Sequence, residues 1–574
     1  MVASSVVNGD SSFPKNIRPP IASYSPSMWG DIFTSFTLDD QVQEDYGKAI
    51  QALKGDARGM LIAEGNTVKD KLILIDTVER LGVGYHFEQE IEDQLQQIFK
   101  FQSQDSDLFT TALQFRLLRQ HRYHVSSNNF HNFTRKTSNL INPDNIVETG
   151  AFDKFKGIDD KFKENLGSDA KGLLSLYEAA HLRIHGEDIL EEALAFTVHH
   201  LNRMVQQIES PLKDQVKRAL QQSLHRGVPR IETRNFISFY EKDDSKNEQL
   251  LKLAKLDFNY LQNLYKKELS ELSRWWNEFD LKTKLPYARD RVVECYFWGL
   301  ASRYEPQYSY VRTAVAKNMQ MVSTIDDTYD NYATLEEAQL FTEALERWNV
   351  DEVERLPDYM KIVYKFILSM YEDYEREAAK RGKSFVTPYA IESVKRLGRA
   401  YNKELKWFME RKLPTFDEYF ANTYFTGCIE VMYIPVILGM EFVSQQTIDW
   451  LMSKPEIVVA ASNVGRYLED LCTHQREEKG GEMLTAVDCY IQQHGGSKSQ
   501  VLNKFVELVE DAWKDVNTAW ITKTCIIPKD MVEQLLNYAR VAEVTYKNRE
   551  DGYTNSEKVL GPQLIALFVD PIII

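Results

Sequence analysis

The sequence predicts an all-α protein with two helical domains. Apolar residues recur at spacings of three and four in many segments, including 173–182, 189–208 and 250–272, as they do on one face of a helix. Alternating β-branched runs bounded by turn residues, which would indicate strands, are almost absent. There is no repeat of fixed period and no long heptad run, which argues against a helical solenoid and a coiled coil.

The chain has 574 residues, more than one simple core usually holds, so two domains are expected. The charged stretch 241–247 separates two helical patterns and is the predicted boundary. We therefore predict an N-terminal segment over 1–36, an N-terminal helical domain over 37–247 and a C-terminal domain over 248–574. Residues 134–161 contain Asn-Pro-Asp and two glycines and predict a surface loop or insertion.

Composition argues against two kinds of partner. Asp and Glu number 85 against 69 Lys and Arg, a net charge of −16, whereas a nucleic-acid binder usually has a basic surplus. The longest apolar runs, such as 431–440, fall short of the ~20 residues that span a bilayer. We therefore predict no nucleic acid and no membrane as partners.

Two observations predict a cytoplasmic protein. The five cysteines are scattered and form no CxxC pair, as expected for reduced thiols. Residues 1–17 are rich in Ser but contain one Lys and no Arg, whereas a plastid transit peptide is usually longer and rich in Arg, so none is predicted.

The first cluster of candidate ligands is Asp326, Asp327 and Asp330. On a helix, Asp326 and Asp330 share a face because they are four residues apart. The cluster follows the apolar stretch 319–325, as if at the mouth of a buried cavity. A solvated helix face is the alternative. An EF-hand calcium site is excluded, because the glycine of its turn and its final Glu are missing.

The second cluster is Glu469, Asp470, Thr473 and Glu477. Glu469, Thr473 and Glu477 share a helical face, and carboxylates with a hydroxyl suit a Mg²⁺ ion that keeps water ligands. The alternative is a surface helix with charges around Arg466. Two such faces turned toward each other could hold several Mg²⁺ ions that also bind substrate phosphates, so the pair predicts a diphosphate site more strongly than either cluster alone.

Arg289 and Arg291 precede an apolar, aromatic run that ends at Trp298. Arginines at a helix entrance can bind phosphate oxygens, or they can form an ordinary salt bridge. Trp298 is either plain core or a cavity wall whose ring stabilises a cation.

The polar stretch from Tyr546 through Asp551 to Tyr553 lies between helical segments. It is either a connector or a lid whose Tyr and Asp side chains handle a proton.

Together these residues resemble the plant terpene synthase family, in particular cytosolic sesquiterpene cyclases of the epi-aristolochene synthase type. The resemblance covers nearly the whole chain. It rests on an ordered set of motifs: Arg18-Pro-Pro with Pro-Ser-Met-Trp29-Gly-Asp31, Leu113–His121, Gly227–Thr233, Leu285–Trp298, Asp326-Asp327-x-x-Asp330, Arg355–Lys361, Asp551-Gly-Tyr-Thr and Glu557–Leu560.

The resemblance implies a C-terminal class I helical bundle that holds the active site, and a catalytically silent, α-barrel-like N-terminal domain. It implies that residues 1–36 cap the active site. It also implies three Mg²⁺ ions, with Mn²⁺ as a substitute. Asp326, Asp330, Glu469, Thr473 and Glu477 would be ligands, with Asp327 in support. Arg289, Arg291 and Arg466 would bind diphosphate. Trp298, Tyr546 and Tyr553 would line the pocket with Asp551 beside them.

Three departures from the family pattern qualify this assignment. The family usually has Asn or Asp where this chain has Glu469, so Asp470 is the alternative ligand. The stretch 423–430 should line the substrate through Thr426 and kink at Gly427, but Glu430 is an unexplained charge there. Residues 134–161 exceed the family's usual link.

The expected reaction is Mg²⁺-dependent ionisation of farnesyl diphosphate, followed by cyclisation to a sesquiterpene hydrocarbon or alcohol, carried out by a monomer. The alternatives are a trans-prenyltransferase, a monoterpene synthase that uses geranyl diphosphate, and a helical binding protein without chemistry. The Asp-x-Asp-Asp motif of protonation-initiated cyclases is absent.

Overall fold

The computed structural model describes residues 17–19, 24–100, 106–127, 150–480, 485–522 and 527–574, with the side chains of 475–480 excepted. Within these ranges every named element is a helix, and the one pairing of extended backbone is an isolated bridge between Lys156 and Phe162. The predicted all-α class is confirmed.

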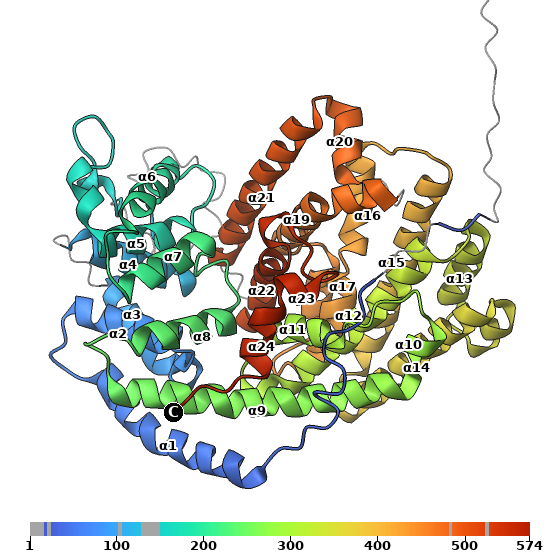
Figure 1. Cartoon of the computed structure of the whole chain (residues 1–574), viewed down its shortest axis with the longest axis horizontal. Coiled ribbons are helices and arrows are strands. Elements are labelled where there is room, and N and C mark those ends of the chain that lie inside the picture. Colours follow the sequence, from blue (N-terminus) through green and yellow to red (C-terminus); the bar gives the residue numbers. More distant parts are fainter. Residues whose placement is uncertain (1–16, 20–23, 101–105, 128–149, 481–484, 523–526) are drawn as a thin grey trace, which may run out of the picture.

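Two sets of helices follow one another along the chain (Figure 1). The predicted boundary, 241–247, falls in the turn between α8 and α9. The first set is α1 (Asp40–Ile62), α2 (Val68–Arg80), α3 (Glu88–Lys100), α4 (Leu108–Gln120), α5 (Ala170–Ala180), α6 (Asp188–Met204), α7 (Leu212–Gln221) and α8 (Pro229–Tyr240). The second is α9 (Glu248–Phe279), α10 (Leu281–Lys284), α11 (Val292–Ser302), α12 (Ser309–Asn331), α13 (Leu335–Arg347), α14 (Asp358–Lys380), α15 (Thr387–Met409), α16 (Phe416–Thr426), α17 (Ile429–Val436), α18 (Gln445–Met452), α19 (Glu456–Gly480), α20 (Ala486–His494), α21 (Lys498–Ile521), α22 (Lys529–Thr545), α23 (Ser556–Val559) and α24 (Gly561–Phe568).

The long helix α9 runs along the base of the molecule and contacts both sets. It begins where the Asn247 side chain accepts hydrogen bonds from the backbone of Gln249 and Leu250, and it ends at Asp280, which takes a left-handed conformation (φ 50°). It packs against α1 and α8 of the first set and against α11, α12 and α24 of the second. One apolar core therefore runs through both halves of the chain.

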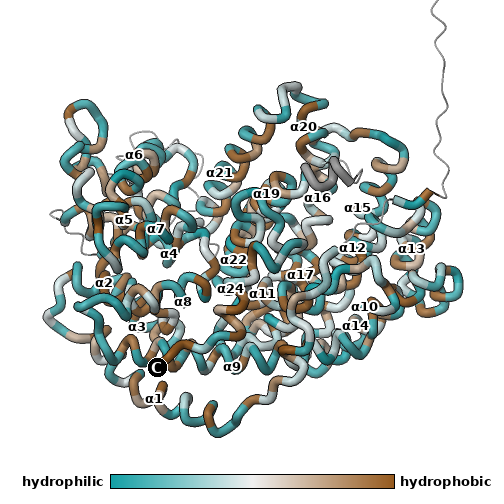
Figure 2. Tube along the Cα trace, viewed as in Figure 1, coloured by the Kyte–Doolittle hydropathy of each residue, from teal (hydrophilic) through white to brown (hydrophobic). Residues whose placement is uncertain are grey.

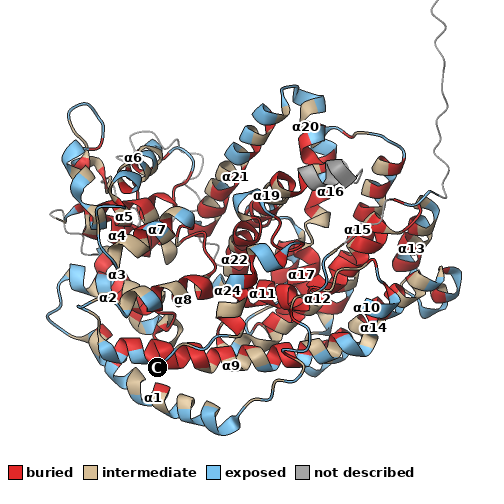
Figure 3. Cartoon of the chain, in the orientation of Figure 1, coloured by how far each residue is buried: buried red, intermediate tan, exposed pale blue. Residues whose placement is uncertain are grey.

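The centre of the second half is a hydrophobic bundle. Every residue of α11 is buried, and Figure 3 shows it enclosed by neighbouring helices. In Figure 2, α11 carries mainly the hydrophobic colour, whereas α1 at the lower edge alternates between hydrophobic and hydrophilic residues. Such a pattern is typical of an inner helix compared with an outer amphipathic one.

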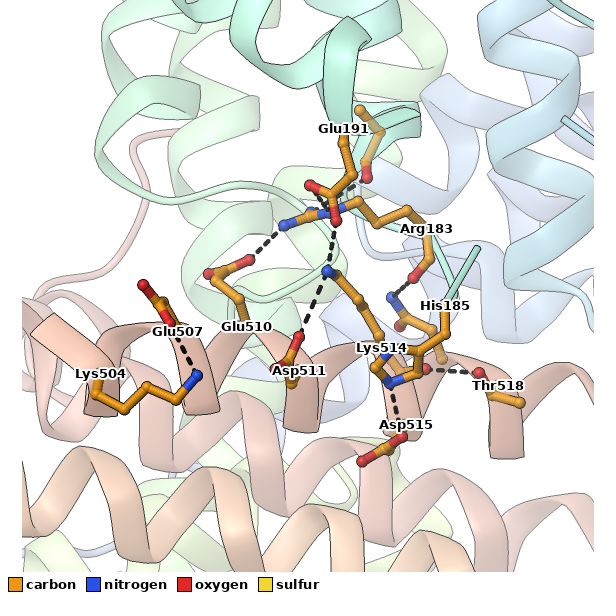
Figure 4. A network of polar contacts seen from close by, with 12 residues as sticks. Arg183, His185, Glu191, Lys504, Glu507, Glu510, Asp511, Lys514, Asp515 and Thr518 are labelled. Atoms are coloured by element: carbon orange, nitrogen blue, oxygen red, sulfur yellow. Dashed lines mark hydrogen bonds and ion pairs between the residues drawn. The ribbon is translucent and has the colours of Figure 1, made fainter. Parts of the chain in front are cut away.

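A network of ion pairs joins the first half to α21 (Figure 4). Glu510 on α21 accepts from Arg226 at 2.6 and 2.7 Å and also pairs with Arg183. The Asn517 side chain donates to the backbone oxygens of His181 and Arg183, at 3.0 and 2.8 Å. Helix α21 also packs along α19, which carries the second cluster. The contacts of α21 with the first half therefore support α19 as well.

One segment, Phe416–Gly439, is long and apolar enough to cross a bilayer by length and composition. In the structure it is broken into α16, α17 and a short 3₁₀ turn, and 78% of its apolar window is buried inside the protein. It forms part of the core.

The predicted insertion, 134–161, is described only from residue 150. There Phe152 and Phe155 are buried, and Lys156 pairs with Glu192 of α6 at 3.0 Å. This end of the segment therefore packs onto the N-terminal helices.

Candidate active site

A cavity of about 170 Å³ lies inside the second half of the chain, among α11, α12, α15, α16, α17, α19, α22 and the segment after α22. Ten of the predicted site residues line it: Arg289, Trp298, Asp326, Asp330, Thr426, Arg466, Glu469, Tyr546, Asp551 and Tyr553. Asp326 and Asp330 of the first cluster and Glu469 of the second, which are far apart in the sequence, therefore face one cavity.

A larger cavity, about 600 Å³, lies between the two halves of the chain. Its walls carry comparable numbers of basic and acidic side chains, and no predicted site residue lines it. The smaller cavity combines convergent polar groups with aromatic walls, which are the features of a ligand site. We therefore place the candidate active site there.

In the first cluster, Asp326 and Asp330 line the cavity, whereas Asp327 lies behind its wall. Asp327 is fully buried and accepts hydrogen bonds from the Arg289 backbone (2.7 Å), from Arg289 Nε (3.2 Å) and from Asn331 (3.2 Å). The prediction also counted Asp327 among the metal residues. Its surroundings fit the supporting role instead, because both of its oxygens hold the cluster's neighbours in place.

Burial and neighbouring charges shift the pKa of Asp326. Burial raises the pKa of Asp326, Arg289 at 2.6 Å lowers it, and Asp327 raises it again, with a net rise. Arg289 also lies over the rings of Tyr24 and Tyr553, at 5.0 and 5.4 Å from their centroids. This arginine is thus fixed at the cavity mouth beside the first cluster.

Arg291, predicted to bind substrate, makes other contacts. It is 2% exposed, does not line the cavity, and donates to the backbone oxygens of Ser25 (2.9 Å), Tyr553 (3.1 Å) and Thr554 (3.0 Å). In this structure Arg291 joins the N-terminal segment to the segment after α22.

In the second cluster, Glu469 lines the cavity and Asp470 does not. Asp470 is fully buried and accepts from Arg466 at 2.8 and 2.9 Å, so it orients that arginine. Burial is the main cause that raises the pKa of Asp470, to about 6, although Arg466 lowers it. Glu469 is therefore the better placed of the two alternatives for a metal ion, despite its longer side chain.

Thr473, the hydroxyl-bearing residue of the second cluster, has an unsatisfied side chain. Its hydroxyl is buried and has no hydrogen-bond partner among the described residues. A buried polar group normally has one, so the hydroxyl is open to a ligand, although Thr473, like Asp470, is not among the residues that line the cavity. Glu477 lies on the same helix, α19, but its side chain falls outside the described residues.

The donors present suit a hard cation such as Mg²⁺: carboxylates of Asp326, Asp330 and Glu469 and a hydroxyl. Burial raises the pKa of Glu469, and the charges of Asp551 and Asp326 across the cavity raise it further, against Arg466. Bound cations would relieve this repulsion. Among the described residues, no group of three or more Asp, Glu, His or Cys side chains is arranged to hold a metal ion by itself. Mg²⁺ usually keeps several waters and binds substrate phosphates beside one or two carboxylates.

Aromatic side chains form much of the remaining wall. Trp298 meets Tyr538 edge to face, with centroids 5.6 Å apart. Tyr546 and Tyr553 follow on either side of Asp551, whose Oδ1 accepts from the backbone of Tyr553 (3.0 Å) and Thr554 (2.9 Å). These backbone contacts fix the turn that carries the predicted lid residues.

The helix break at the cavity wall lies one residue beyond the predicted kink. Gly427 keeps a helical φ of −67°, and Cys428 takes the left-handed conformation (φ 53°) between α16 and α17. Glu430 is turned away from the cavity and pairs with Arg396 of α15 at 3.3 Å. The charge that the sequence left unexplained therefore has its partner outside the cavity.

The described part of the N-terminal segment lies against the catalytic half. Arg18 pairs with Glu337 at 3.0 Å, Asn331 donates to the Tyr24 hydroxyl at 2.6 Å, and Trp29 donates to Glu294 at 3.0 Å. Tyr24 lines the cavity. The described residues of this segment therefore reach the cavity, and the capping role stays a prediction.

Sequence reasoning missed several wall residues: Tyr24, Tyr401, Glu404, Cys428 and Tyr538. Glu404 accepts from Asn422 (3.0 Å) and Thr426 (3.1 Å), and burial raises its pKa to about 7. The sequence does place Glu404 and Tyr401 on one face of a helix, because they are three residues apart. It does not show that this face lines a cavity.

Two family descriptions match the chain. "Terpene synthase, N-terminal domain" matches residues 28–146 and 144–220, and "Terpene synthase family, metal binding domain" matches residues 277–515. The second match contains both clusters.

Relatives extend over almost the whole chain. Gamma-cadinene synthase of Ocimum basilicum is 50% identical over 569 residues, which are 98% of this chain and 100% of that protein. Tau-cadinol synthase of Lavandula angustifolia is 48% identical over 567 residues, 97% and 98% of the two chains.

Solved structures share the fold. Isoprene synthase from grey poplar (Populus x canescens) superposes with a TM-score of 0.83 at 33% identity, covering 96% of this chain and 99% of its own. Another structure of that enzyme contains three Mg²⁺ ions and dimethylallyl-S-thiolodiphosphate. Limonene synthase with 2-fluorolinalyl diphosphate gives 0.87 at 29% identity, over 96% and 99% of the two chains. On these grounds the chain belongs to the terpene synthase family.

Proposed function

We propose that this protein is a class I sesquiterpene synthase that ionises farnesyl diphosphate and cyclises the resulting cation to a sesquiterpene hydrocarbon or alcohol. The observation that carries the proposal is one cavity that brings Asp326, Asp330 and Glu469 together with Arg289, Arg466 and an aromatic wall. Such a cavity can hold a diphosphate at its polar end and a hydrocarbon chain against its rings.

Asp326, Asp330, Glu469 and Thr473 would hold the metal ions, together with the predicted ligand Glu477. We propose three Mg²⁺ ions, with Mn²⁺ as a substitute. Such ions, when bound, neutralise charge on the diphosphate and so promote its departure.

The chain's own residues complete the reaction site. Arg289 and Arg466 offer guanidinium groups to the departing diphosphate, and Asp327 and Asp470 hold these groups in place. The rings of Trp298 and Tyr553 exclude water from the cation and stabilise it.

Tyr546 and Asp551 both line the cavity and stand as candidate proton handlers.

The substrate is inferred from relatives. Four of them, 46–50% identical, are named for the sesquiterpenes gamma-cadinene, tau-cadinol, gamma-curcumene and germacrene A, which have fifteen carbons, as the farnesyl group does. We propose that the enzyme acts as a monomer in the cytoplasm, where the reduced state expected of its scattered cysteines is maintained.

The test is incubation of the purified protein with farnesyl, geranyl or geranylgeranyl diphosphate, each with Mg²⁺ or a chelator and with or without isopentenyl diphosphate. The products are identified by gas chromatography with mass spectrometry. We expect sesquiterpenes from farnesyl diphosphate in the presence of Mg²⁺. Longer prenyl diphosphates would show a prenyltransferase, preferential use of geranyl diphosphate a monoterpene synthase, and no turnover of any substrate a binding protein.

A further inference from the structure

Three elements meet at one hydroxyl group on the cavity wall. Tyr538 of α22 lines the cavity and donates a hydrogen bond of 3.1 Å from its hydroxyl to the backbone oxygen of Gly427, at the break between α16 and α17. The path of this side chain runs directly beside Gly465 of α19. A Cβ atom at Gly465 would lie 2.9 Å from the Tyr538 hydroxyl.

The contact matters because of where the helix breaks. Backbone carbonyls at a helix end lose their intrahelical partners, and a carbonyl oxygen at a cavity wall carries partial negative charge that attracts a cation. The left-handed residue Cys428 directly follows Gly427, so the direction of this carbonyl depends on a backbone conformation that is costly for a residue other than glycine. The Tyr538 hydroxyl fixes that direction. Burial raises the pKa of Tyr538 well above its usual value, so the hydroxyl remains protonated and can donate.

The same side chain also supports the aromatic wall. Its ring meets Trp298 edge to face at 5.6 Å and Tyr433 at 6.2 Å, and it is 5% exposed. Tyr538 thus sets both the direction of the Gly427 carbonyl and the arrangement of the aromatic rings around the space where the substrate cation would fold. From this geometry we infer that Tyr538 is a positioning residue that determines product specificity, and that Gly465 is glycine in order to admit it. The inference rests on the proposed cyclisation.

The test is the product distribution from farnesyl diphosphate, measured for Tyr538→Phe and Gly465→Ala. Tyr538→Phe keeps the ring and removes the hydrogen bond. Gly465→Ala keeps the hydroxyl and displaces it. We expect both variants to change the ratio of the two main products in the same direction, by about fivefold, the factor to which an ordinary hydrogen bond of ~1 kcal/mol corresponds. In the double variant the shift should not add, because both changes act on one contact.

Tyr433→Phe is the matched control. The ring of Tyr433 packs against the ring of Tyr538, and its buried hydroxyl lies 3.2 Å from Ser302 Oγ. Tyr433 does not contact the Gly427 carbonyl and does not line the cavity. We expect this variant to keep the wild-type product ratio. The Mg²⁺ dependence of Gly465→Ala is measured in parallel, because Gly465 neighbours Arg466. An unchanged Mg²⁺ dependence shows that the substitution acts on Tyr538 and not on diphosphate binding by Arg466.

Wild-type product ratios from Tyr538→Phe and Gly465→Ala would overturn the inference, as would an equal shift from Tyr433→Phe. If Tyr538→Phe does not fold, Gly465→Ala alone decides. Failure of the proposed function is recognised differently, because the wild-type protein would then form no terpene from any prenyl diphosphate.

Discussion

At the scale of single residues, adjacent carboxylates in the two clusters face opposite ways. Asp326 and Glu469 line the cavity, whereas Asp327 and Asp470 are fully buried and do not line it. Asp327 and Asp470 hold the guanidinium groups of Arg289 and Arg466. The same two arginines also pair with Asp326 (2.6 Å) and Glu469 (3.3 Å), so bound metal ions would compete with them for these two carboxylates. Each cluster therefore combines a ligand with a support for a diphosphate-binding side chain.

Thr473 gives a direct test of the metal assignment. Thr473→Ala removes the orphan hydroxyl, and we expect the Mg²⁺ concentration for half-maximal activity to rise by about tenfold or more, as it does when groups around a metal are lost. Thr473→Ser keeps the hydroxyl and should remain close to wild type. Activity is measured over a Mg²⁺ titration, and identical titrations for Thr473→Ala and wild type would exclude the hydroxyl as a ligand.

The sequence predicted the residue types of the site well, but not every direction in which they point. Spacing placed Asp326 and Asp330 on one helical face, and both line the cavity. It could not show that Glu430 pairs with Arg396, or that Arg291 binds backbone oxygens, because these partners lie on other elements. Tyr538 was missed for the same reason: its role depends on Gly427, which is distant in the sequence.

At the scale of helices, Glu510 fastens α21 to the N-terminal half. Glu510→Gln leaves the buried guanidinium group of Arg226 without its paired carboxylate, and leaves Arg183 with Glu191 (2.9 Å) as its remaining one. We expect the free energy of unfolding to fall by about 1–3 kcal/mol, below the range for a fully buried pair because 34% of the Glu510 side chain is exposed.

The matched control lies on the same helix. Glu507 pairs with Lys504 at the surface, where 66% and 42% of the side chains are exposed (Figure 4). We expect Glu507→Gln to change stability by less than about 0.5 kcal/mol in urea unfolding. Equal effects of the two substitutions would contradict the bracing role of Glu510.

His121 joins three helices in a way that depends on pH. At the end of α4 it contacts Glu79 of α2 (2.6 Å) and Glu92 of α3 (3.5 Å). Burial lowers its pKa, but Glu79 and Glu92 outweigh burial and raise it from 6.5 to about 9. A pKa raised in the folded state stabilises the protein fully below about pH 6.5, and this contribution is lost as pH rises through 9.

We therefore expect His121→Asn to destabilise the protein by up to about 3 kcal/mol at pH 6 and by little at pH 10. Urea unfolding of wild type and variant at both pH values measures the difference. A difference that does not change with pH would show that His121 acts only through packing.

At the scale of the whole molecule, two helical halves share one core, yet only the second contains the candidate site. The first half contributes by docking against α21 and by supplying the N-terminal segment that reaches the cavity through Tyr24. The sequence predicted the helical class, because helical periodicity is a local signal. The boundary at 241–247 stays a prediction, which falls in the turn before α9. The smaller cavity is formed by packing between helices that are distant in the sequence, which periodicity does not encode.

The central claim is that both clusters act on one diphosphate. The most direct measurement follows inorganic diphosphate release and hydrocarbon formation together, from farnesyl diphosphate, in wild type and Asp326→Ala. We expect one diphosphate per terpene in wild type, with both signals abolished by a chelator and by Asp326→Ala, whose circular dichroism should remain that of the wild-type helical fold. Near-normal release of diphosphate by a folded Asp326→Ala variant would contradict the account.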